Sequence, residues 1–397
     1  MNYLVSVTNL FLDCPGGSAR VAWDIACLMR DRGHRVGILC RKQKPGDADT
    51  CEIDGIHITR FPFPRTHTLD PFKLRKRIRC GVQAARELLG DFKPDVVHSH
   101  QVPEGHIAWQ AFGNGPRHVY TVHSSAILEQ KINWLSAGLP GRIKWIFGRR
   151  ILRNLEEGIL RKADRIHCLS QYTRSLVEED YGLGSQVEVI PHWCRANFQR
   201  EKSKLEARRL LQWPAEAKFL FSVRRLGPRY GLDVAIKAAA PLLRSRPDLY
   251  YAIAGDGQWA TYLRELARSL GVAGKVLFLG RVRDDLLQRC YEAADLFLLP
   301  TVSLECFGLI VLESYAFGLP VLGTDVGAIP ELVGPISPQM IVPAHDVEAM
   351  GAKLEQFVNG RLEVPSAQAI HAYIAGNYSP QAVVPRLARF LEDWPAR

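Results

Sequence analysis

The chain has 397 residues, of which 47% are hydrophobic and 23% are charged, and it carries a formal net charge of +10 at pH 7. No apolar run reaches the length of about 18 residues that a membrane-spanning helix needs, so this globular composition excludes a transmembrane protein. The chain is longer than one hydrophobic core usually fills, which predicts two domains.

Cysteine usage and the first residues bear on the cellular compartment. The nine cysteines are odd in number, widely spaced and without a CxxC pair, which is typical of reduced thiols. The opening residues, MNYLVSVTNLFLD, have no positively charged leader and predict a buried first strand in place of a signal peptide. We therefore expect a cytoplasmic protein.

The positive charge is concentrated in the first half of the chain. Residues 1–195 hold 28 Lys and Arg against 20 Asp and Glu, a net of +8, whereas residues 196–397 hold 23 against 21, a net of +2. Ten of the twelve histidines also lie in the first half. This half is expected to face an anionic partner or an anionic surface.

Strand-like and helix-like segments alternate along the first half. Strands are predicted at residues 3–7, 35–40, 56–61, 96–98, 119–122, 165–169 and 187–190. Helices are predicted at 19–32, with Ser18 as the N-cap, and at 73–89, 143–162 and 171–179. The polar residues 195–206 lack strand character and mark the expected domain junction.

The second half repeats this alternation. Strands are predicted at 219–223, 250–254, 276–279, 296–299, 321–323 and 340–342, and helices at 232–245, 258–270, 284–293, 308–317 and 347–359, before an amphipathic tail at 379–394. Such alternation is typical of parallel sheets covered by helices on both faces. We expect two doubly wound, Rossmann-like α/β domains facing a shared cleft, residues 1–195 and 196–378, with a C-terminal helix at 379–397 returning to the first.

The most informative stretch is 295–331, which predicts a strand, a polar loop, a helix and a second strand. Glu305 lies just before the predicted helix, and Glu313 lies within it on an otherwise apolar face. A helix N-terminus beside the end of a strand is an anion site, because free N–H groups and the helix dipole point at it. The two acids are better suited to accept hydrogen bonds from hydroxyl groups. Phosphate together with hydroxyls predicts a sugar nucleotide as the ligand.

Three arginines, Arg224, Arg225 and Arg229, directly follow the predicted strand at 219–223. They form either a solvated basic loop or a clamp for a diphosphate, and their place at a strand end favours the clamp, since arginine binds phosphate oxygens with a fixed fork. Gly255 also follows a strand, in a turn that allows close backbone approach.

Histidines end two strands of the first half. His98 and His100 end one, and His123 ends the next. Histidines at such positions can ligate zinc, but no further ligand stands at a supporting spacing, so no metal is expected. We expect His123 to hydrogen-bond a sugar or an acceptor, and His98 is equally consistent with a structural residue. A glycosidase-like pair of Glu305 and Glu313 is not assured by their spacing.

Two basic segments with interleaved apolar residues lie in the first half. The segment from Phe72 to Arg79 holds five basic residues in eight, and the segment from Arg142 to Arg165 holds eight basic and three acidic residues. They are either solvated helix faces or a patch for an anionic membrane surface. Nucleic acid is not expected as a partner, because no motif for it is present.

Together these residues resemble the retaining glycosyltransferases of family 4, also called glycosyl transferases group 1, which have the two-domain GT-B fold. The resemblance covers nearly the whole chain and is strongest in the E-x7-E element from Glu305 to Glu313. The supporting motifs are Gly16-Gly17, PDVVHSH at 94–100, His123, ADRIHCLS at 163–170, VIPHW at 189–193, Arg225-Leu226, AGDG at 254–257, Gly318-Leu-Pro320 and Gly327-Ala-Ile-Pro330-Glu331.

The resemblance implies roles for residues of both domains. Glu305 would bind the hydroxyls of the transferred sugar, Glu313 the ribose, and His123 the reactive edge of the sugar. Arg225 and Arg229 would oppose the charge that grows on the leaving diphosphate. The other donor-binding positions would be Gly16, Gly17, Gly255, Arg281, Val282, Cys306, Phe307, Gly308 and Leu309.

The implied activity is that of a hexosyltransferase that uses a UDP- or GDP-sugar and retains the anomeric configuration. In the family's front-face route the leaving phosphate itself takes the acceptor's proton, so no nucleophilic side chain, metal or cofactor is expected. The acceptor would be a glycan or a lipid-linked molecule of cell-surface polysaccharide or glycolipid synthesis, with the enzyme peripheral on the inner face of the membrane. The alternatives are a GT-B epimerase or hydrolase of the sugar nucleotide, and a non-catalytic partner subunit that binds the donor.

One position departs from the family pattern. The family usually has R-L-x-x-x-K-G, and here Tyr230 stands in place of the lysine, with Arg229 one residue earlier as its candidate replacement. Loss of a cation at this place would weaken stabilisation of the leaving group by about 3 kcal/mol. This departure motivates the non-catalytic alternative.

Overall fold

A computed structural model describes residues 1–62, 71–135, 138–194 and 200–395 of the chain. The chain divides into two compact units. The first unit contains Met1–Ile190 together with Leu387–Arg397, and the second contains Pro191–Arg386. The two units are described separately below.

The first unit is built on an eight-stranded sheet in the order β3-β4-β2-β1-β5-β6-β7-β8. Its strands are β1 (Asn2–Ser6), β2 (Arg35–Arg41), β3 (Thr50–Ile53), β4 (Ile56–Phe61), β5 (Val96–Ser99), β6 (Arg117–Val122), β7 (Arg165–Cys168) and β8 (Val187–Val189). Neighbouring strands run parallel except β3 and β4. The order reverses between β1 and β5, so the carboxyl ends of these two central strands form a topological switch point.

The antiparallel edge corrects the expectation of a wholly parallel sheet. Strand β3 was not predicted, and it pairs with β4 through a two-residue loop, Asp54-Gly55. Both loop residues have positive φ, 51° at Asp54 and 73° at Gly55. An Asp-Gly pair in this conformation is the favoured connection of a β-hairpin, so the signal was present in the sequence.

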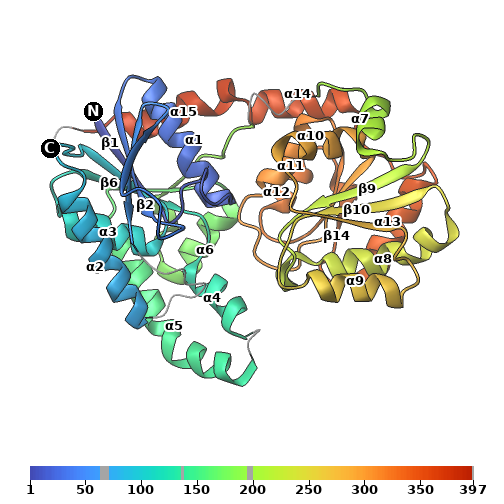
Figure 1. Ribbon diagram of the computed structural model, residues 1–397, viewed down its shortest axis with the longest axis horizontal. Helices are drawn as coiled ribbons and strands as arrows, with labels where there is room; N and C mark the ends of the chain where they lie inside the picture. The colour runs from blue at the N-terminus through green and yellow to red at the C-terminus, as the bar shows by residue number, and fades with distance from the viewer. Residues whose placement is uncertain (63–70, 136–137, 195–199, 396–397) are drawn as a thin grey trace. The chain divides into compact units, whose positions relative to one another are not determined.

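Helices lie on both sides of this sheet, with α2 and α3 on one side and α1 on the other (Figure 1). The helices of the unit are α1 (Gly17–Asp31), α2 (Pro71–Glu87), α3 (Val102–Phe112), α4 (Ala126–Leu135), α5 (Gly138–Leu160) and α6 (Gln171–Tyr181), with a 3₁₀ turn at η1 (Gly184–Gln186). Helices α3 and α4 were not predicted. The N-cap of α1 is Gly16 and no side chain caps it, so the assignment of Ser18 as the cap is wrong.

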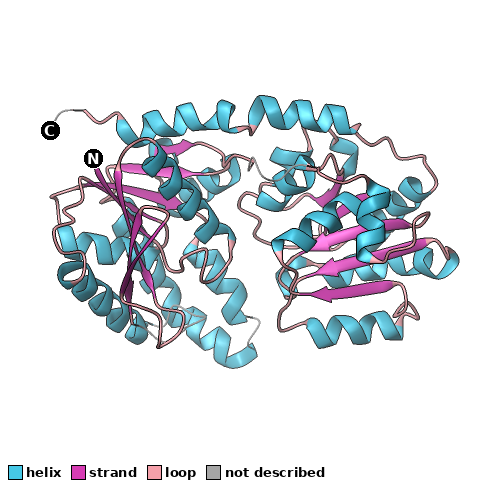
Figure 2. Ribbon diagram, turned by 45° about the horizontal axis from the view of Figure 1, so that its top comes forward, coloured by secondary structure: helices cyan, strands magenta, loops and turns pink. Residues whose placement is uncertain are grey.

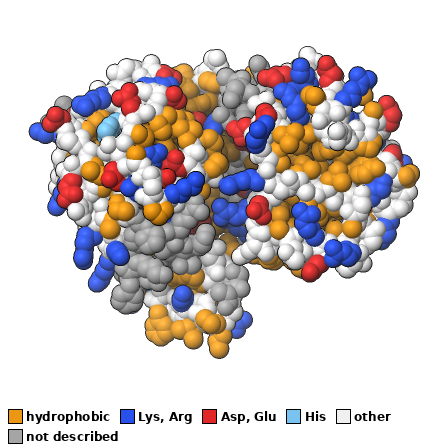
Figure 3. Space-filling model, viewed as in Figure 1, with side chains coloured by type: hydrophobic (Ala, Val, Ile, Leu, Met, Phe, Trp, Pro, Cys, Tyr) orange, Lys and Arg blue, Asp and Glu red, His pale blue; other side chains and the backbone are white. Residues whose placement is uncertain are grey.

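Helix α5 presents an apolar stripe to solvent in its first half. The stripe comprises Leu139, Ile143, Ile146, Phe147 and Ile151, which are all exposed, and their spacing places them along one side of the helix. Phe147 is 75% exposed and Leu139 71%. In Figure 3 hydrophobic side chains gather at the lower end of the first unit, where α5 lies, with lysines and arginines nearby.

The second unit is built on a six-stranded sheet in the order β11-β10-β9-β12-β13-β14, with every neighbouring pair parallel. The strands are β9 (Lys218–Val223), β10 (Leu249–Ala254), β11 (Val276–Gly280), β12 (Leu296–Leu299), β13 (Val321–Thr324) and β14 (Ile341–Val342). This is the strand order of a dinucleotide-binding fold, whose switch point lies between β9 and β12. A ligand is expected at the carboxyl ends of these two strands.

Helices cover both faces of this sheet as well (Figure 2). They are α7 (Lys204–Leu211), α8 (Leu232–Ser245), α9 (Ala260–Ser269), α10 (Asp284–Ala293), α11 (Leu309–Ala316), α12 (Ile329–Val333), α13 (Val347–Val358) and α14 (Ala367–Asn377), with 3₁₀ turns at η2 (Pro228–Tyr230) and η3 (Pro338–Met340). The last helix, α15 (Pro380–Glu392), continues into the first unit from Leu387 onward. No helix among the described residues is both long and apolar enough to cross a membrane.

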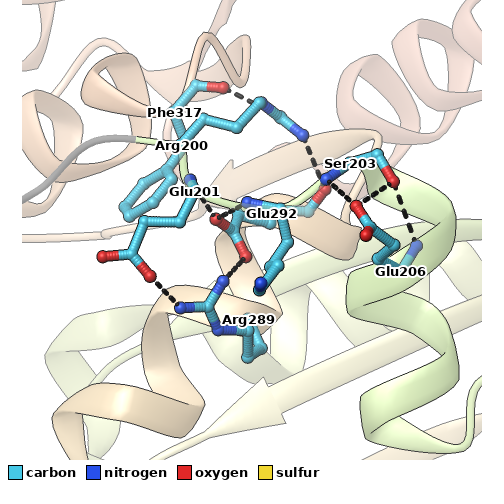
Figure 4. Close-up of polar contacts among 8 residues, drawn as sticks. Arg200, Glu201, Ser203, Glu206, Arg289, Glu292 and Phe317 are labelled. Atoms are coloured by element: carbon cyan, nitrogen blue, oxygen red, sulfur yellow. Dashed lines mark hydrogen bonds and ion pairs between the residues drawn. The ribbon is translucent and has the colours of Figure 1, made fainter.

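Residues 200–206 of the second unit are anchored to helix α10. The Glu292 carboxylate is fully buried, and its Oε1 accepts the backbone N–H groups of Glu201 at 2.7 Å and Lys202 at 2.9 Å. Its Oε2 accepts from Arg289 at 2.6 Å. Figure 4 shows these contacts beside the capping box of α7, in which the Ser203 side chain and backbone exchange hydrogen bonds with residue 206. The described part of the polar stretch at which the domain junction was predicted therefore includes the start of helix α7.

Candidate functional site

Two loops meet at the switch point of the second unit. One follows β9 and contains residues 224–231, and the other follows β12 and contains residues 300–306. The backbone N–H of Val302 donates to the carbonyl oxygen of Arg229 at 2.9 Å. Gly231 has φ +65°, and a Cβ there would lie 1.7 Å from the carbonyl oxygen of Pro300. A glycine is therefore required at 231 for the loops to join backbone to backbone.

The side chains that these loops present form an ion pair between Arg224 and Glu305. Arg224 Nη2 donates to Glu305 Oε2 at 2.5 Å and to Thr301 Oγ1 at 2.9 Å. The Arg224 side chain is 8% exposed and that of Glu305 is 14%. Leu304, which precedes the acid, has φ +56°, a conformation that costs a non-glycine residue energy and recurs at functional sites. The structure thus holds Glu305 in one orientation.

Tyr230 lies against two of the three arginines. The guanidinium carbon of Arg224 is 4.7 Å from the centroid of the Tyr230 ring, and that of Arg229 is 4.8 Å from it. Arg229 Nη2 also donates to the Tyr230 hydroxyl at 3.0 Å. Arg225, by contrast, is exposed at the end of β9. The role that sequence reasoning missed is that of Arg224, because the sequence of three arginines within six residues does not show which one turns toward the acid.

Glu313 lies in α11 with a different partner from Glu305. Its Oε2 accepts from the hydroxyl of Tyr291 at 3.0 Å. Burial, and then the charge of Glu313, raise the pKa of Tyr291 well above its usual value, so this hydroxyl stays protonated and donates. Burial and the same carboxylate raise the pKa of Cys194 to about 12. The carboxylate of Glu313 is therefore oriented by a neutral donor, while Glu305 is held by a cation.

Helix α11 begins at Leu309, one residue later than predicted, behind a loop that contains Cys306 and the buried Phe307. Its N-cap, Gly308, has φ +92°, no side chain caps it, and its first turn has no acidic residue. The backbone N–H of Val311 donates to the Gly308 carbonyl at 2.8 Å, so the predicted anion site would use the N–H groups of Leu309 and Ile310.

Gly255, Arg281 and Val282 follow β10 and β11. Gly255 has φ +129°, and a Cβ there would lie 1.8 Å from the carbonyl oxygen of Arg224. Its lack of a side chain is required by packing between two loops, which is a different reason from the predicted approach of a ligand. Arg281 is exposed and Val282 is half-buried, at the ends of strands farther from the switch point.

Gly16 and Gly17 of the first unit lie at the N-terminus of α1, after β1. Gly16 is extended, with φ −179°, and the first turn of the helix holds no acidic residue. Both glycines are exposed. The N–H groups of this helix end form a second place in the chain where an anion is favoured.

His123 lies at the end of β6 against His100. The two rings are stacked with centroids 5.1 Å apart, and His100 Nδ1 and His123 Nε2 share a hydrogen bond of 2.8 Å. His100 is buried and His123 is half-buried. Among the described residues no group of three or more His, Cys, Asp or Glu side chains is arranged to hold a metal ion.

His98 belongs to a buried network that runs across four strands. The Tyr3 hydroxyl lies 2.8 Å from His98 Nδ1, and His98 Nε2 lies 2.6 Å from Thr121 Oγ1. Thr121 Oγ1 lies 2.9 Å from His167 Nδ1, and His167 Nε2 donates to the Ile190 carbonyl at 2.9 Å. Burial lowers the pKa of His98 well below its usual value. The structural reading of His98 is confirmed.

The structure therefore groups the predicted site residues by unit. Arg225, Arg229, Gly255, Glu305 and the entrance to α11 lie at the strand ends of the second sheet, and Glu313 lies in the helix that follows. Gly16, Gly17 and His123 lie at the corresponding edge of the first sheet.

Two doubly wound α/β units, one of them with an acid–arginine pair beside a helix N-terminus at its switch point, are the architecture of the GT-B fold. The family model for glycosyl transferases group 1 matches residues 203–375, and the model for glycosyltransferase family 4 matches residues 15–196. The chain belongs to glycosyltransferase family 4, and it is an enzyme of that class.

Named relatives agree with this assignment. The chain is 30% identical to the D-inositol 3-phosphate glycosyltransferase of Streptosporangium roseum, over 76% of this chain and 70% of that protein. It is 28% identical to the enzyme of the same name from Thermobispora bispora, over 97% of this chain and 92% of that protein.

Solved structures share the fold at low sequence identity. Sucrose-phosphate synthase from Thermosynechococcus elongatus superposes with a TM-score of 0.83 at 18% identity, over 99% of both chains. HepE from Anabaena, solved in complex with UDP-glucose, gives a TM-score of 0.73 at 18% identity, over 99% of this chain and 100% of that one.

Proposed function

We propose that the protein is a retaining glycosyltransferase that moves a sugar from a nucleotide-sugar donor to a glycan or lipid-linked acceptor in cell-surface glycan synthesis. The observation that carries the proposal is the ion pair between Arg224 and Glu305 at the β9/β12 switch point, beside the uncapped N-terminus of α11. A helix N-terminus, which favours an anion, and an oriented acid lie together there, and this supports binding of a sugar diphosphate.

The donor would lie across the strand ends of the second unit. Its phosphates would bind the N–H groups that begin α11, with Arg225 and Arg229 opposing the charge that grows as the sugar–phosphate bond breaks. Glu305 uses Oε2 for Arg224, and its Oε1 would accept from a sugar hydroxyl. Glu313, held by Tyr291, would accept from the ribose. HepE, which shares the fold, was solved with UDP-glucose, which supports a nucleotide sugar as the donor.

The first unit would supply the acceptor side. His123, beside His100, would hydrogen-bond the sugar or the acceptor hydroxyl, and the N-terminus of α1 at Gly16 and Gly17 would approach the diphosphate. No residue is assigned as a covalent nucleophile, because in a front-face reaction the leaving phosphate takes the acceptor's proton. The donor is a substrate, and we assign neither a metal nor a cofactor to the site.

An anionic membrane surface is proposed as the place of action, supported by α5. Its exposed apolar stripe is flanked by Arg142, Lys144, Arg149 and Arg150, all exposed. An apolar stripe with basic edges suits the boundary between headgroups and acyl chains of an anionic bilayer. The opposite side of α5 packs against α4, since a Cβ at Gly148 would lie 2.6 Å from the ring of the buried Trp134 in α4.

The second basic segment, from Phe72 to Arg79, offers fewer exposed positive charges to a membrane surface than the sequence suggested. Arg77 is buried and forms an ion pair with the fully buried Glu104, and it donates to Thr8 Oγ1 at 2.7 Å. Arg165, in the longer segment, is likewise used internally, through the backbone carbonyl of Phe390. The surface proposed for the membrane is therefore the first half of α5, with Arg75 and Arg79 of α2 as exposed additional charges.

The function is tested with the purified full chain, UDP- and GDP-sugars and a panel of glycan and lipid-linked acceptors. We expect nucleoside diphosphate release that depends on an acceptor, and loss of transfer in Glu313→Ala and Arg225→Ala but not in the exposed control Glu348→Ala. If both site variants transfer sugar normally, the site assignment is wrong. Free sugar formed without acceptor indicates a hydrolase or epimerase, and donor binding without turnover indicates a partner subunit.

A further inference from the structure

Tyr230, the residue that departs from the family pattern, contacts the guanidinium groups of two arginines in the second unit. Its ring faces the guanidinium groups of both Arg224 and Arg229, at 4.7 Å and 4.8 Å, within the range of about 6 Å over which cation–π attraction acts. Its hydroxyl accepts from Arg229. One neutral aromatic side chain therefore contacts two cations that would otherwise repel each other.

The two arginines differ in how their charge is balanced. Arg224 is paired with Glu305 and Thr301 and is nearly buried. Its Nε–H is nevertheless a buried donor with no hydrogen-bond partner among the described residues. A buried charged donor left unsatisfied costs free energy. It therefore marks a place where a ligand acceptor would be favourable.

Arg229 is fixed at its backbone as well as at its side chain. Its carbonyl oxygen accepts from the N–H of Val302, 2.9 Å away, and it lies 3.3 Å from that of Ser303. The main chain of the loop is therefore anchored to the loop that carries Glu305. The direction of the guanidinium, in contrast, depends on contacts of the side chain, among them the Tyr230 hydroxyl and ring.

We propose that Tyr230 is a positioning residue that holds the guanidinium groups of Arg224 and Arg229 together at the site of the donor's diphosphate. A lysine in its place would add a third cation, whereas the tyrosine adds none and arranges the two already present. This inference rests on the proposed function, and it assigns to Tyr230 an effect on the diphosphate alone and none on the base or ribose.

The test compares nucleoside diphosphates with nucleoside monophosphates. Binding of UDP, UMP, GDP and GMP to the full chain is measured by calorimetry for the native protein and for Tyr230→Phe, Tyr230→Leu and Tyr230→Trp. We expect the diphosphate of the preferred base to bind about 3-fold more weakly to Tyr230→Phe and about 10- to 30-fold more weakly to Tyr230→Leu. Tyr230→Trp, which keeps an aromatic face, should recover most of the loss. The monophosphate should change less than about 2-fold.

A control variant separates the positioning role from a general effect of removing a tyrosine from this unit. Tyr262→Leu removes an exposed tyrosine from α9 of the same unit and should leave both affinities unchanged. If the ratio of diphosphate affinity to monophosphate affinity is the same in Tyr230→Leu as in the native protein, the positioning role is overturned. If the native protein binds none of the four nucleotides, the proposed function itself is wrong, which is a different outcome.

Discussion

Arg224 Nη2 lies 2.5 Å from Glu305 Oε2, so the acid expected to contact the sugar is neutralised by its own unit before a donor arrives. The pair is shielded from solvent, and breaking it by removing one partner leaves a charge in a place of low polarity. The contributions of Arg224 and Glu305 to donor binding are therefore expected to be coupled.

This coupling predicts a non-additive double-mutant cycle. Arg224→Met and Glu305→Gln should each weaken donor binding, and the double variant should lose less than the sum of the two, by about 1–3 kcal/mol. Binding of UDP- and GDP-sugars measured by calorimetry provides the cycle. Arg225→Met combined with Glu305→Gln is the matched control, because Arg225 is exposed. Additive losses in both cycles would contradict a functional coupling.

The apolar stripe of α5 predicts membrane binding that specific side chains govern. Ile146→Ser together with Phe147→Ser should weaken binding to anionic vesicles, measured by co-flotation, about 100-fold or more, because each side chain contributes about 1.5–3 kcal/mol once it is buried in the bilayer. The melting temperature should stay unchanged, because both side chains are exposed in the protein alone. Leu286→Ser, an exposed leucine of α10 in the second unit, is the control. Equal flotation of all variants at low salt would refute the assignment.

Buried Glu156 predicts a pH-dependent stability. Its carboxylate accepts from the Tyr181 hydroxyl at 2.5 Å and from the backbone N–H of Ala126 at 2.9 Å, yet burial dominates and raises its pKa from 4.5 to about 7. The folded state therefore keeps a proton that the unfolded chain releases between these values. The free energy of unfolding should fall by about 3 kcal/mol as the pH rises through this window, and then level off.

Urea unfolding at pH 5 to 8 measures this effect as a difference between variants. Glu156→Gln, which cannot ionise, should flatten the profile of the first unit, whereas Glu157→Gln, next to it and partly exposed, should leave the profile as in the native protein. An unaltered slope in Glu156→Gln would show that this carboxyl does not titrate in the window.

The anchor at Glu292 predicts a strong dependence of the second unit on one buried carboxylate. Glu292→Ala removes the acceptor of two backbone N–H groups and one of the two acceptors of Arg289, which keeps Glu201, and should destabilise the unit by about 3–5 kcal/mol. Glu292→Gln, which keeps an acceptor oxygen, should cost less. Hydrogen exchange of residues 200–206 localises the effect, because their amides should exchange faster in Glu292→Ala. Protection equal to that of the native protein would rule out the anchoring role.

Much of this architecture was predictable from the chain alone, and the exceptions have physical causes. The buried parallel strands were predicted from short apolar runs between turns. The family resemblance is confirmed. Helix α3 was missed because Val102, Ile107 and Ala108 are buried together with polar neighbours such as Glu104, which hides the usual helical period. The hairpin at Asp54 was missed although its turn residues are favourable.

The candidate site was predictable in its position and less so in its contacts. The strand–loop–helix pattern places Glu305 in the loop before a helix, and the structure has it between β12 and α11. Spacing alone does not say which of the three arginines at 224, 225 and 229 turns inward, because that depends on loop packing at Gly231 and Gly255. Whether Arg229 compensates for the missing lysine stays a prediction, now with Tyr230 as the residue that orients it.

The buried network from Tyr3 to Ile190 has a direction. The carbonyl of Ile190 can only accept a hydrogen bond, so a neutral His167 carries its proton on Nε2. Its Nδ1 then accepts a hydrogen bond from the Thr121 hydroxyl, whose oxygen accepts one from His98 Nε2. His98 is left to accept from the tyrosine, whose pKa burial raises well above its usual value. A single proton arrangement thus runs through strands β1, β5, β6 and β7, and each side chain reports the state of the next. Tyr3→Phe would remove the first donor and leave a lone pair without a partner at the centre of the sheet, so an NMR spectrum of the imidazole nitrogens would register the change as far away as His167.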